Sequence, residues 1–231
     1  MFQLLIGVHK LLRHGAKEPE YVPMSVIGSP RRGKTTFIKT LIEQREIGWK
    51  GRTKHAYSQS GSHQPKTPVE GSAEDLHART AGVEVKTIEL PGGEKFRASD
   101  FAGHLAFLMS HHHFLANEHG FYLALLDALS AFNEMLEEAV YWIRFILATR
   151  PVRYGLPRVV VAFSHGDLCG EGGSDRAQRA LHRLCADFHG LVQFPQEKQP
   201  FLLDCRTWNE DMESLVQELQ RQHNFLREVR A

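Results

Sequence analysis

The sequence predicts an α/β domain built on a mostly parallel β-sheet. Strand-like apolar segments alternate with helix-like segments along the chain, a pattern that places helices between parallel strands. A β-branched run at residues 158–163 is typical of a strand buried on both faces, as strands of parallel sheets are. The length of 231 residues fits one domain, and no internal repeat is visible. We therefore expect one domain over residues 21–231, with a helix and linker over residues 1–20.

The first half of the chain predicts one strand, one helix and a long loop. Apolar residues recur at near-helical spacing over residues 2–12, which favours a short N-terminal helix. Residues 22–27 form an apolar run that ends at a glycine, as a buried strand does before a turn, and an apolar helix face follows over residues 35–46. The polar stretch over residues 49–75 buries too little apolar area to offset the cost of ordering it, so we expect a loop there.

The second half predicts five strands and three helices. Residues 82–90 alternate apolar and polar, and the Pro-Gly-Gly turn after them predicts a hairpin with residues 95–99. The other expected strands are residues 121–126, 158–163 and 201–203. The expected helices are residues 132–149, which Pro151 stops, residues 174–188, which a serine begins and Gly190 follows, and residues 211–229.

Length, charge and cysteine content exclude several classes of protein. The 231 residues carry 28 Lys and Arg against 27 Asp and Glu, so we do not expect a bulk nucleic-acid binder. The apolar share of 42% is typical of a folded domain. Cys169, Cys185 and Cys205 match no zinc spacing, and their odd number argues against a disulfide framework. With no membrane-spanning run and no signal peptide in the sequence, we expect a cytoplasmic protein without membrane insertion.

A phosphate-binding pattern follows the first expected strand. Residues 28–35 read Gly-Ser-Pro-Arg-Arg-Gly-Lys-Thr and match G-x-x-x-x-G-K-[ST] without a mismatch. Backbone N–H groups of such a loop, together with the helix N-terminus after it, bind phosphate oxygens. Lys34 adds a point charge for the β- and γ-phosphates, and the Thr35 hydroxyl is a Mg²⁺ ligand. The phosphate-binding candidates are Gly28, Ser29, Pro30, Arg31, Arg32, Gly33, Lys34, Thr35 and Thr36.

The loop contains a proline and two arginines, which are unusual for a phosphate-binding loop. Pro30 stiffens the loop and removes one N–H donor. For Arg31 and Arg32, exposure to water is favoured over contact with nucleotide, because long charged side chains are usually exposed.

Three later residues suit the γ-phosphate and a metal ion. Thr80, between the long loop and the next strand, can bring its hydroxyl to Mg²⁺ and its N–H to the γ-phosphate. Asp100 and Gly103 form a D-x-x-G pattern that we expect just after the second hairpin strand. The Asp100 carboxylate can hold Mg²⁺ through water, and the Gly103 N–H can approach the γ-phosphate closely. The metal candidates are therefore Thr35, Thr80 and Asp100, and Gly103 joins the phosphate-binding set.

A third pattern suits the nucleotide base. Ser164, His165 and Asp167 follow the β-branched strand and match the guanine signature [NT]-[KH]-x-D except at the serine. A carboxylate at Asp167 can accept hydrogen bonds from N1–H and N2–H₂ of guanine, whereas adenine has no such donors there and would leave it unpaired. The serine and the histidine depart from the commonest residues of the pattern, which suggests weaker holding of the nucleotide.

Taken together in this order, the motifs resemble those of the Ras-like P-loop GTPases, and within them the Roc domain of Roco proteins. The resemblance covers about residues 23–228 and also rests on residues 100–103, 110–115 and 164–167. It implies a six-stranded, mostly parallel sheet with helices on both faces, and a GTP-binding switch with slow Mg²⁺-dependent hydrolysis. It places Cys205 and Arg206 in the last base-binding loop and a long switch I loop at about residues 49–80. Roco proteins carry leucine-rich repeats before this domain and a dimerising COR domain after it, so contact with those domains of a longer parent chain, or a homodimer, is the partner it implies.

Several alternatives stay open at this stage. His104 stands where Ras-like enzymes place a water-orienting glutamine; with Lys34 and Thr80 it completes the catalytic candidates, although a histidine that points away from the site is equally open. The histidine run at residues 111–113 lacks metal-ligand spacing, and Asp127 is interpreted as structural. A nucleotide-bound interaction module with negligible turnover is the second hypothesis, and an ATP-using P-loop enzyme is the third.

Overall fold

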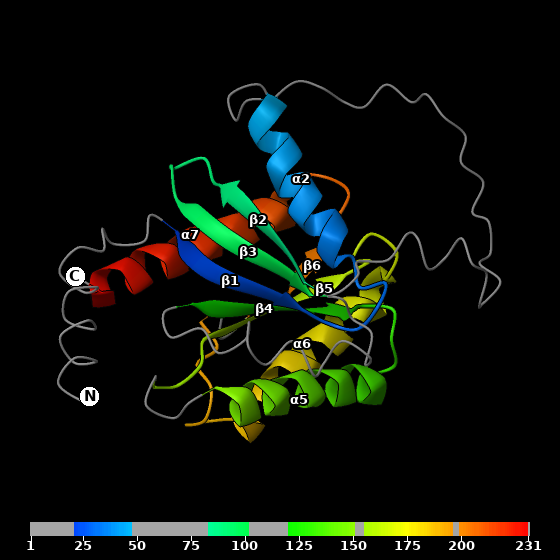
Figure 1. Ribbon diagram of the computed structural model, residues 1–231. Coiled ribbons are helices and arrows are strands. Elements are labelled where there is room, and N and C mark those ends of the chain that lie inside the picture. Colours follow the sequence, from blue (N-terminus) through cyan, green and yellow to red (C-terminus); the bar gives the residue numbers. More distant parts are fainter. Residues whose placement is uncertain (1–20, 48–82, 102–119, 151–154, 196–198, 231) are drawn as a thin grey trace, which may run out of the picture.

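The computed structural model describes residues 21–47, 83–101, 120–150, 155–195 and 199–230 (Figure 1). The expected N-terminal helix, the long polar loop, and the candidates Thr80, Gly103 and His104 lie outside these residues. In chain order the elements are β1 (Val22–Ile27), α2 (Lys34–Ile47), β2 (Val83–Glu89), β3 (Lys95–Phe101), β4 (Phe121–Asp127), α5 (Phe132–Thr149), β5 (Val159–Ser164), α6 (Gly170–Asp187), β6 (Phe201–Leu203) and α7 (Glu210–Arg230).

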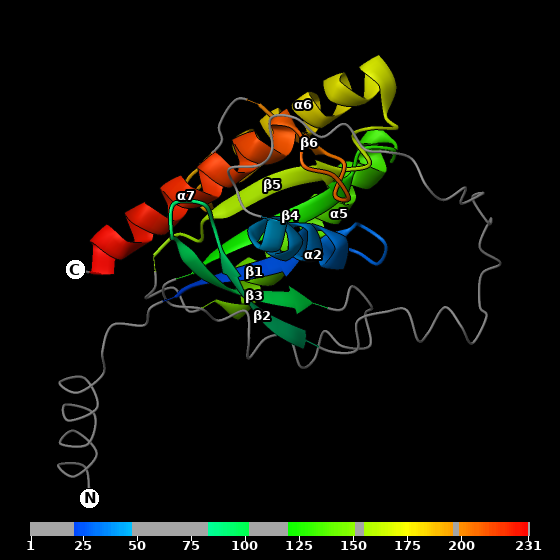
Figure 2. The same cartoon turned by 90° about the horizontal axis from the view of Figure 1, so that it is seen from above.

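The six strands form one sheet in the order β2-β3-β1-β4-β5-β6 (Figure 2). The β2–β3 hairpin is antiparallel, and the four other pairs, β1–β3, β1–β4, β4–β5 and β5–β6, are parallel. The prediction of a six-stranded, mostly parallel sheet is therefore confirmed. Because β1, β3, β4 and β5 run in the same direction, their carboxyl ends meet at one edge of the sheet, where ligands of such sheets bind.

Helices cover both faces of the sheet, with α2 and α7 on one side and α5 and α6 on the other (Figure 1). Strand β4 shows why both faces need a cover. Its Phe121, Leu123 and Leu125 side chains join the core under α2 and α7, whereas Tyr122 and Leu126 join the core under α5 and α6. Alternation of apolar residues to both faces is what a central strand of a two-sided sheet requires. None of the helices in the described ranges is long and apolar enough to cross a membrane.

Two boundaries differ from the sequence prediction by more than one residue. Strand β3 continues to Phe101, because β1 and β2 both pair with Asp100 and β2 also pairs with Phe101, so Asp100 lies inside the strand rather than after it. Helix α6 begins at Gly170, four residues before the expected serine. Glycine disfavours helix, but tertiary packing overrides that propensity. A Cβ atom at Gly173 would lie only 2.4 Å from Cys169 Cβ, so this turn is packed too closely for a larger residue.

Candidate nucleotide-binding site

The phosphate-loop candidates join the end of β1 to the start of α2, at the carboxyl edge of the sheet. Gly28 has a φ of +145°, and a Cβ atom there would lie 2.3 Å from the Leu125 carbonyl oxygen. Gly33 has a φ of +76°, and a Cβ atom there would lie 3.0 Å from Cys205 Sγ. Both positions therefore require glycine for backbone conformation and for space. Pro30, Arg31 and Thr36 are exposed around the loop.

Lys34 is buried beneath this loop. Its Nζ donates hydrogen bonds of 2.8 Å to the carbonyl oxygens of Gly28 and Ser29. Burial lowers the pKa of Lys34 to about 8, although the nearby carboxylates of Asp100 and Glu138 favour its charged form. The ammonium is thus held at the loop by backbone carbonyls that an incoming phosphate could replace.

Thr35 and Asp100 form the second part of the site. The Thr35 hydroxyl donates a hydrogen bond of 2.5 Å to Asp100 Oδ2, and Asp100 is fully buried in β3. Burial raises the pKa of Asp100, because the charged carboxylate loses water. Its other oxygen, Oδ1, has no hydrogen-bond partner among the described residues.

These two residues fit a magnesium ion. Mg²⁺ prefers oxygen ligands and is often bound through one or two carboxylates together with substrate phosphates. The orphaned Asp100 Oδ1 beside the Thr35 hydroxyl offers such oxygens. Within the described ranges no three His, Cys, Asp or Glu side chains cluster as a metal site, so phosphate oxygens and water would complete the coordination. Thr80, the third metal candidate, lies outside the described residues.

The base-binding candidates lie on two loops, after β5 and after β6. Ser164 is buried, and its hydroxyl donates to the Leu126 carbonyl oxygen at 2.9 Å, which ties the end of β5 to β4. Asp167 Oδ2 accepts a hydrogen bond of 2.8 Å from Arg206 Nη2. Arg206 Nε also donates to Asp204 Oδ1 at 2.8 Å. The carboxylate that is expected to bind guanine is therefore paired with an arginine of the second base loop.

Cys205 joins the base loops to the phosphate loop. Its carbonyl oxygen accepts a hydrogen bond of 2.7 Å from the Thr40 hydroxyl of α2. A Cβ atom at Gly33 would lie 3.0 Å from Cys205 Sγ and 3.8 Å from Ser164 Cβ, so all three loops meet at this point. Burial raises the pKa of Cys205 to about 12, which makes it a neutral packing residue. The backbone of Cys205 is thus fixed relative to the phosphate loop, as a base-binding loop requires.

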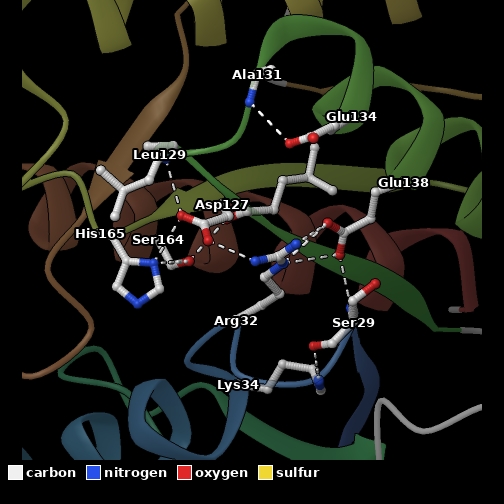
Figure 3. A network of polar contacts seen from close by, with 12 residues as sticks. Ser29, Arg32, Lys34, Asp127, Leu129, Ala131, Glu134, Glu138, Ser164 and His165 are labelled. Atoms are coloured by element: carbon white, nitrogen blue, oxygen red, sulfur yellow. Dashed lines mark hydrogen bonds and ion pairs between the residues drawn. The ribbon is translucent and has the colours of Figure 1, made fainter. Parts of the chain in front are cut away.

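Arg32 corrects one sequence expectation. It does not extend into water: its Nη1 lies 2.6 Å from Asp127 Oδ2, and its Nε donates to Glu138 Oε2 at 3.0 Å (Figure 3). Glu138 Oε1 accepts a hydrogen bond of 2.8 Å from the Ser29 N–H. The sequence interpretation did not single out Glu138, because its partner on the phosphate loop is 106 residues away in the chain. The sequence does contain one indication of this contact. Helix α5 follows β4, a strand parallel to β1, and therefore begins at the same edge of the sheet as the phosphate loop.

Comparisons with known proteins agree with this architecture. A bacterial selenocysteine-specific elongation factor, EF-Sec, superposes with a TM-score of 0.57 at 14% identity, over 87% of this chain and 28% of the factor's chain. The Arl6 (BBS3) small GTPase from Trypanosoma brucei, with the nucleotide analogue GppNp bound, superposes with a TM-score of 0.54 at 15% identity, over 87% of this chain and 99% of its own. The fold is that of a P-loop GTPase. No protein-family model and no curated protein sequence matches the chain.

Proposed function

We propose that the protein is a GTP-binding switch that hydrolyses GTP slowly in the presence of Mg²⁺. The observation that carries the proposal is the meeting of the three loops at Gly33, Ser164 and Cys205. It brings the phosphate loop, the Thr35–Asp100 pair and Asp167 to the carboxyl edge of one sheet. The likeness of the fold to a small GTPase that binds a GTP analogue supports the same conclusion.

The chemistry would consist of positioning and charge stabilisation. Lys34 would exchange the carbonyl oxygens of Gly28 and Ser29 for phosphate oxygens, while the backbone N–H groups of the loop hold the remaining oxygens. Thr35 and Asp100 would hold Mg²⁺, with Thr80 as the third candidate ligand. The ion, when bound, neutralises charge on the β- and γ-phosphates. We propose Gly103 for γ-phosphate contact and His104 for orienting the attacking water.

Base recognition falls to Asp167, with Ser164, His165, Cys205 and Arg206 around it. Guanine binding requires Asp167 to exchange its Arg206 partner for the N1–H and N2–H₂ donors. That exchange replaces one charge-assisted hydrogen bond to Asp167 by two. We further propose, from the sequence motifs, that the chain is the G domain of a cytoplasmic Roco-type signalling protein that dimerises or contacts leucine-rich-repeat and COR domains.

Nucleotide binding to the purified chain tests the main proposal. We expect GDP and GTP to bind more tightly than ADP and ATP, and Asp167→Asn to shift the preference from guanine toward xanthine nucleotides. Asp175→Asn, a matched change of an exposed aspartate on α6, should leave the preference unchanged. Tighter binding of ATP than GTP by the parent chain, or no shift in the Asp167 variant, would instead favour an ATP-using enzyme.

Turnover separates a switch from an interaction module. We expect slow release of phosphate from GTP at saturating Mg²⁺ under single-turnover conditions. If His104 orients water, His104→Ala slows this step and leaves GTP affinity unchanged. Tight GTP binding without measurable phosphate release would support the module instead.

A further inference from the structure

Arg32 lies between two carboxylates that come from different elements. Its guanidinium contacts Asp127 at the end of β4 through Nη1 and Glu138 on α5 through Nε and Nη2 (Figure 3). The Arg32 side chain is 23% exposed, and those of Asp127 and Glu138 are 13% and 9% exposed. Partly buried, charge-assisted contacts of this geometry are among the stronger polar interactions in proteins. Glu138 also accepts the Ser29 N–H, so two residues of the phosphate loop, Ser29 and Arg32, bind one carboxylate.

Asp127 carries this connection to the first base loop. While its Oδ2 binds Arg32, its Oδ1 lies 2.9 Å from His165 Nδ1 and accepts the Leu129 N–H at 3.0 Å. One carboxylate thus contacts the phosphate loop with one oxygen and the base loop with the other. In the β4–β5 register, Asp127 also stands beside Ser164, which precedes His165.

The backbone at His165 needs such support. Its φ is +58°, a left-handed conformation that costs a residue with a side chain roughly 1 kcal/mol or more. The contact with Asp127 helps to hold it there. Asp167 is two residues further along the same loop, so a change in the backbone at His165 would move the Asp167 carboxylate. Loss of Arg32 would leave Asp127 and Glu138 without their shared cation and would remove the Oδ2 contact that helps to orient the Asp127 carboxylate.

We propose that Arg32 is a positioning residue that couples the two halves of the site, so that guanine discrimination by Asp167 depends on an arginine of the phosphate loop. The inference rests on the proposed guanine-nucleotide function and deepens it. Arg32 itself touches the carboxylates and has no part in contacting the base. Its effect passes through Asp127 and His165.

The test compares GDP with IDP, whose base lacks the 2-amino group that Asp167 recognises. Affinities of the full chain and its variants are measured by competition with a fluorescent guanine nucleotide. In Arg32→Gln we expect the GDP-to-IDP affinity ratio to fall by about fivefold or more, the scale of typical coupling between sites. Arg144→Gln, which removes an exposed arginine from the same helix as Glu138, should change neither affinity. Equal weakening of GDP and IDP, with the ratio unchanged, would overturn the inference and assign Arg32 to the phosphate loop alone.

A second variant protects the test against unfolding of the first. Glu138→Gln keeps the shape of the side chain and removes one of the two charges on Arg32, so we expect a smaller fall of the same ratio in a folded protein, checked by circular dichroism. An unchanged ratio in Glu138→Gln would also count against the coupling. If the parent chain binds GDP no better than ADP, the proposed function fails and the inference fails with it. A parent that prefers GDP, with ratios unchanged in both variants, overturns the inference alone.

Discussion

Replacing Asp100 with asparagine should stabilise the nucleotide-free protein while it abolishes Mg²⁺-dependent GTP binding. Asp100 is fully buried, and its Oδ1 has no partner among the described residues. A charged oxygen left unpaired in a protein interior costs on the order of 1–3 kcal/mol or more. Asparagine keeps an oxygen that can accept the Thr35 hydroxyl and removes the charge, although it also removes the attraction to Lys34.

The upward shift in the pKa of Asp100 decides whether the asparagine stabilises or destabilises the folded protein. The shift persists despite the favourable charge of Lys34, so ionised Asp100 is a net cost to the fold. Protonation therefore favours the folded state, and this stability is complete below about pH 3.9 and is lost as the pH rises through the folded pKa. We expect Asp100→Asn to gain about 1 kcal/mol at pH 8, which corresponds to about 2–4 °C in Tm for a chain of this size.

Thermal unfolding in EDTA without nucleotide, between pH 4 and pH 8, measures this effect. The advantage of Asp100→Asn should be largest at pH 8 and shrink as the pH falls. Asp204→Asn is a control of opposite sign: burial raises the pKa of Asp204, but hydrogen bonds from Arg206 outweigh it and lower the pKa overall, so this variant should lose stability at pH 8. A lower Tm for Asp100→Asn at every pH would refute the reasoning, and so would Mg²⁺-dependent GTP affinity equal to that of the parent.

Three further predictions concern the loops. GDP binding at pH 8 should take up about half a proton, because the pKa of Lys34 is lowered to about 8 and a bound phosphate restores the charge of the ammonium. Calorimetry in buffers of different ionisation enthalpy measures the number of protons taken up, and a value of zero would contradict the prediction. Arg206→Ala should raise GDP affinity by at most about fivefold, since the ion pair between Arg206 and Asp167 is exposed and stabilises by about 1 kcal/mol or less. Weaker GDP binding in this variant would show instead that Arg206 contacts the base. Gly28→Ala should lower the free energy of unfolding by roughly 2–4 kcal/mol because of the clash with the Leu125 carbonyl oxygen. The control is Gly93→Ala, at a position that has a positive φ but open space around it, and this variant should lose only about 1 kcal/mol. Equal losses in the two variants would refute the steric argument.

The parts of the fold that depend on local chemistry were predictable from the sequence. The bounds of α5 and β6 match the expected ranges, because Pro151 and the flanking polar residues mark their ends locally. The start of α6 was not predictable, because the first turn of the helix packs Gly173 against Cys169, a contact that no local pattern reveals. The sequence pattern predicts Asp100 just after the second hairpin strand, whereas pairing with two neighbouring strands extends β3 to include it.

The site divides in the same way. The glycines, Lys34 and Thr35 were predictable because backbone turns and phosphate chemistry restrict those positions to few residue types. The environment of Arg32 was not, because it depends on which side chains α5 and β4 bring to the loop from distant parts of the chain. The pairing of Arg206 with Asp167 also joins two loops that only the sheet order brings together.

The buried thiol of Cys205, at the junction of the three loops, makes loop opening measurable by chemical labelling. A thiol reacts as its thiolate, and the pKa of Cys205, raised to about 12, keeps it unreactive in the closed fold. Cys169 and Cys185 are partly exposed, so we expect an alkylating reagent to label these two faster than Cys205. The rate at which an alkylating reagent labels Cys205 therefore measures how often the loops around Gly33 separate. This rate can be followed through the nucleotide cycle at a native cysteine, without an engineered labelling site.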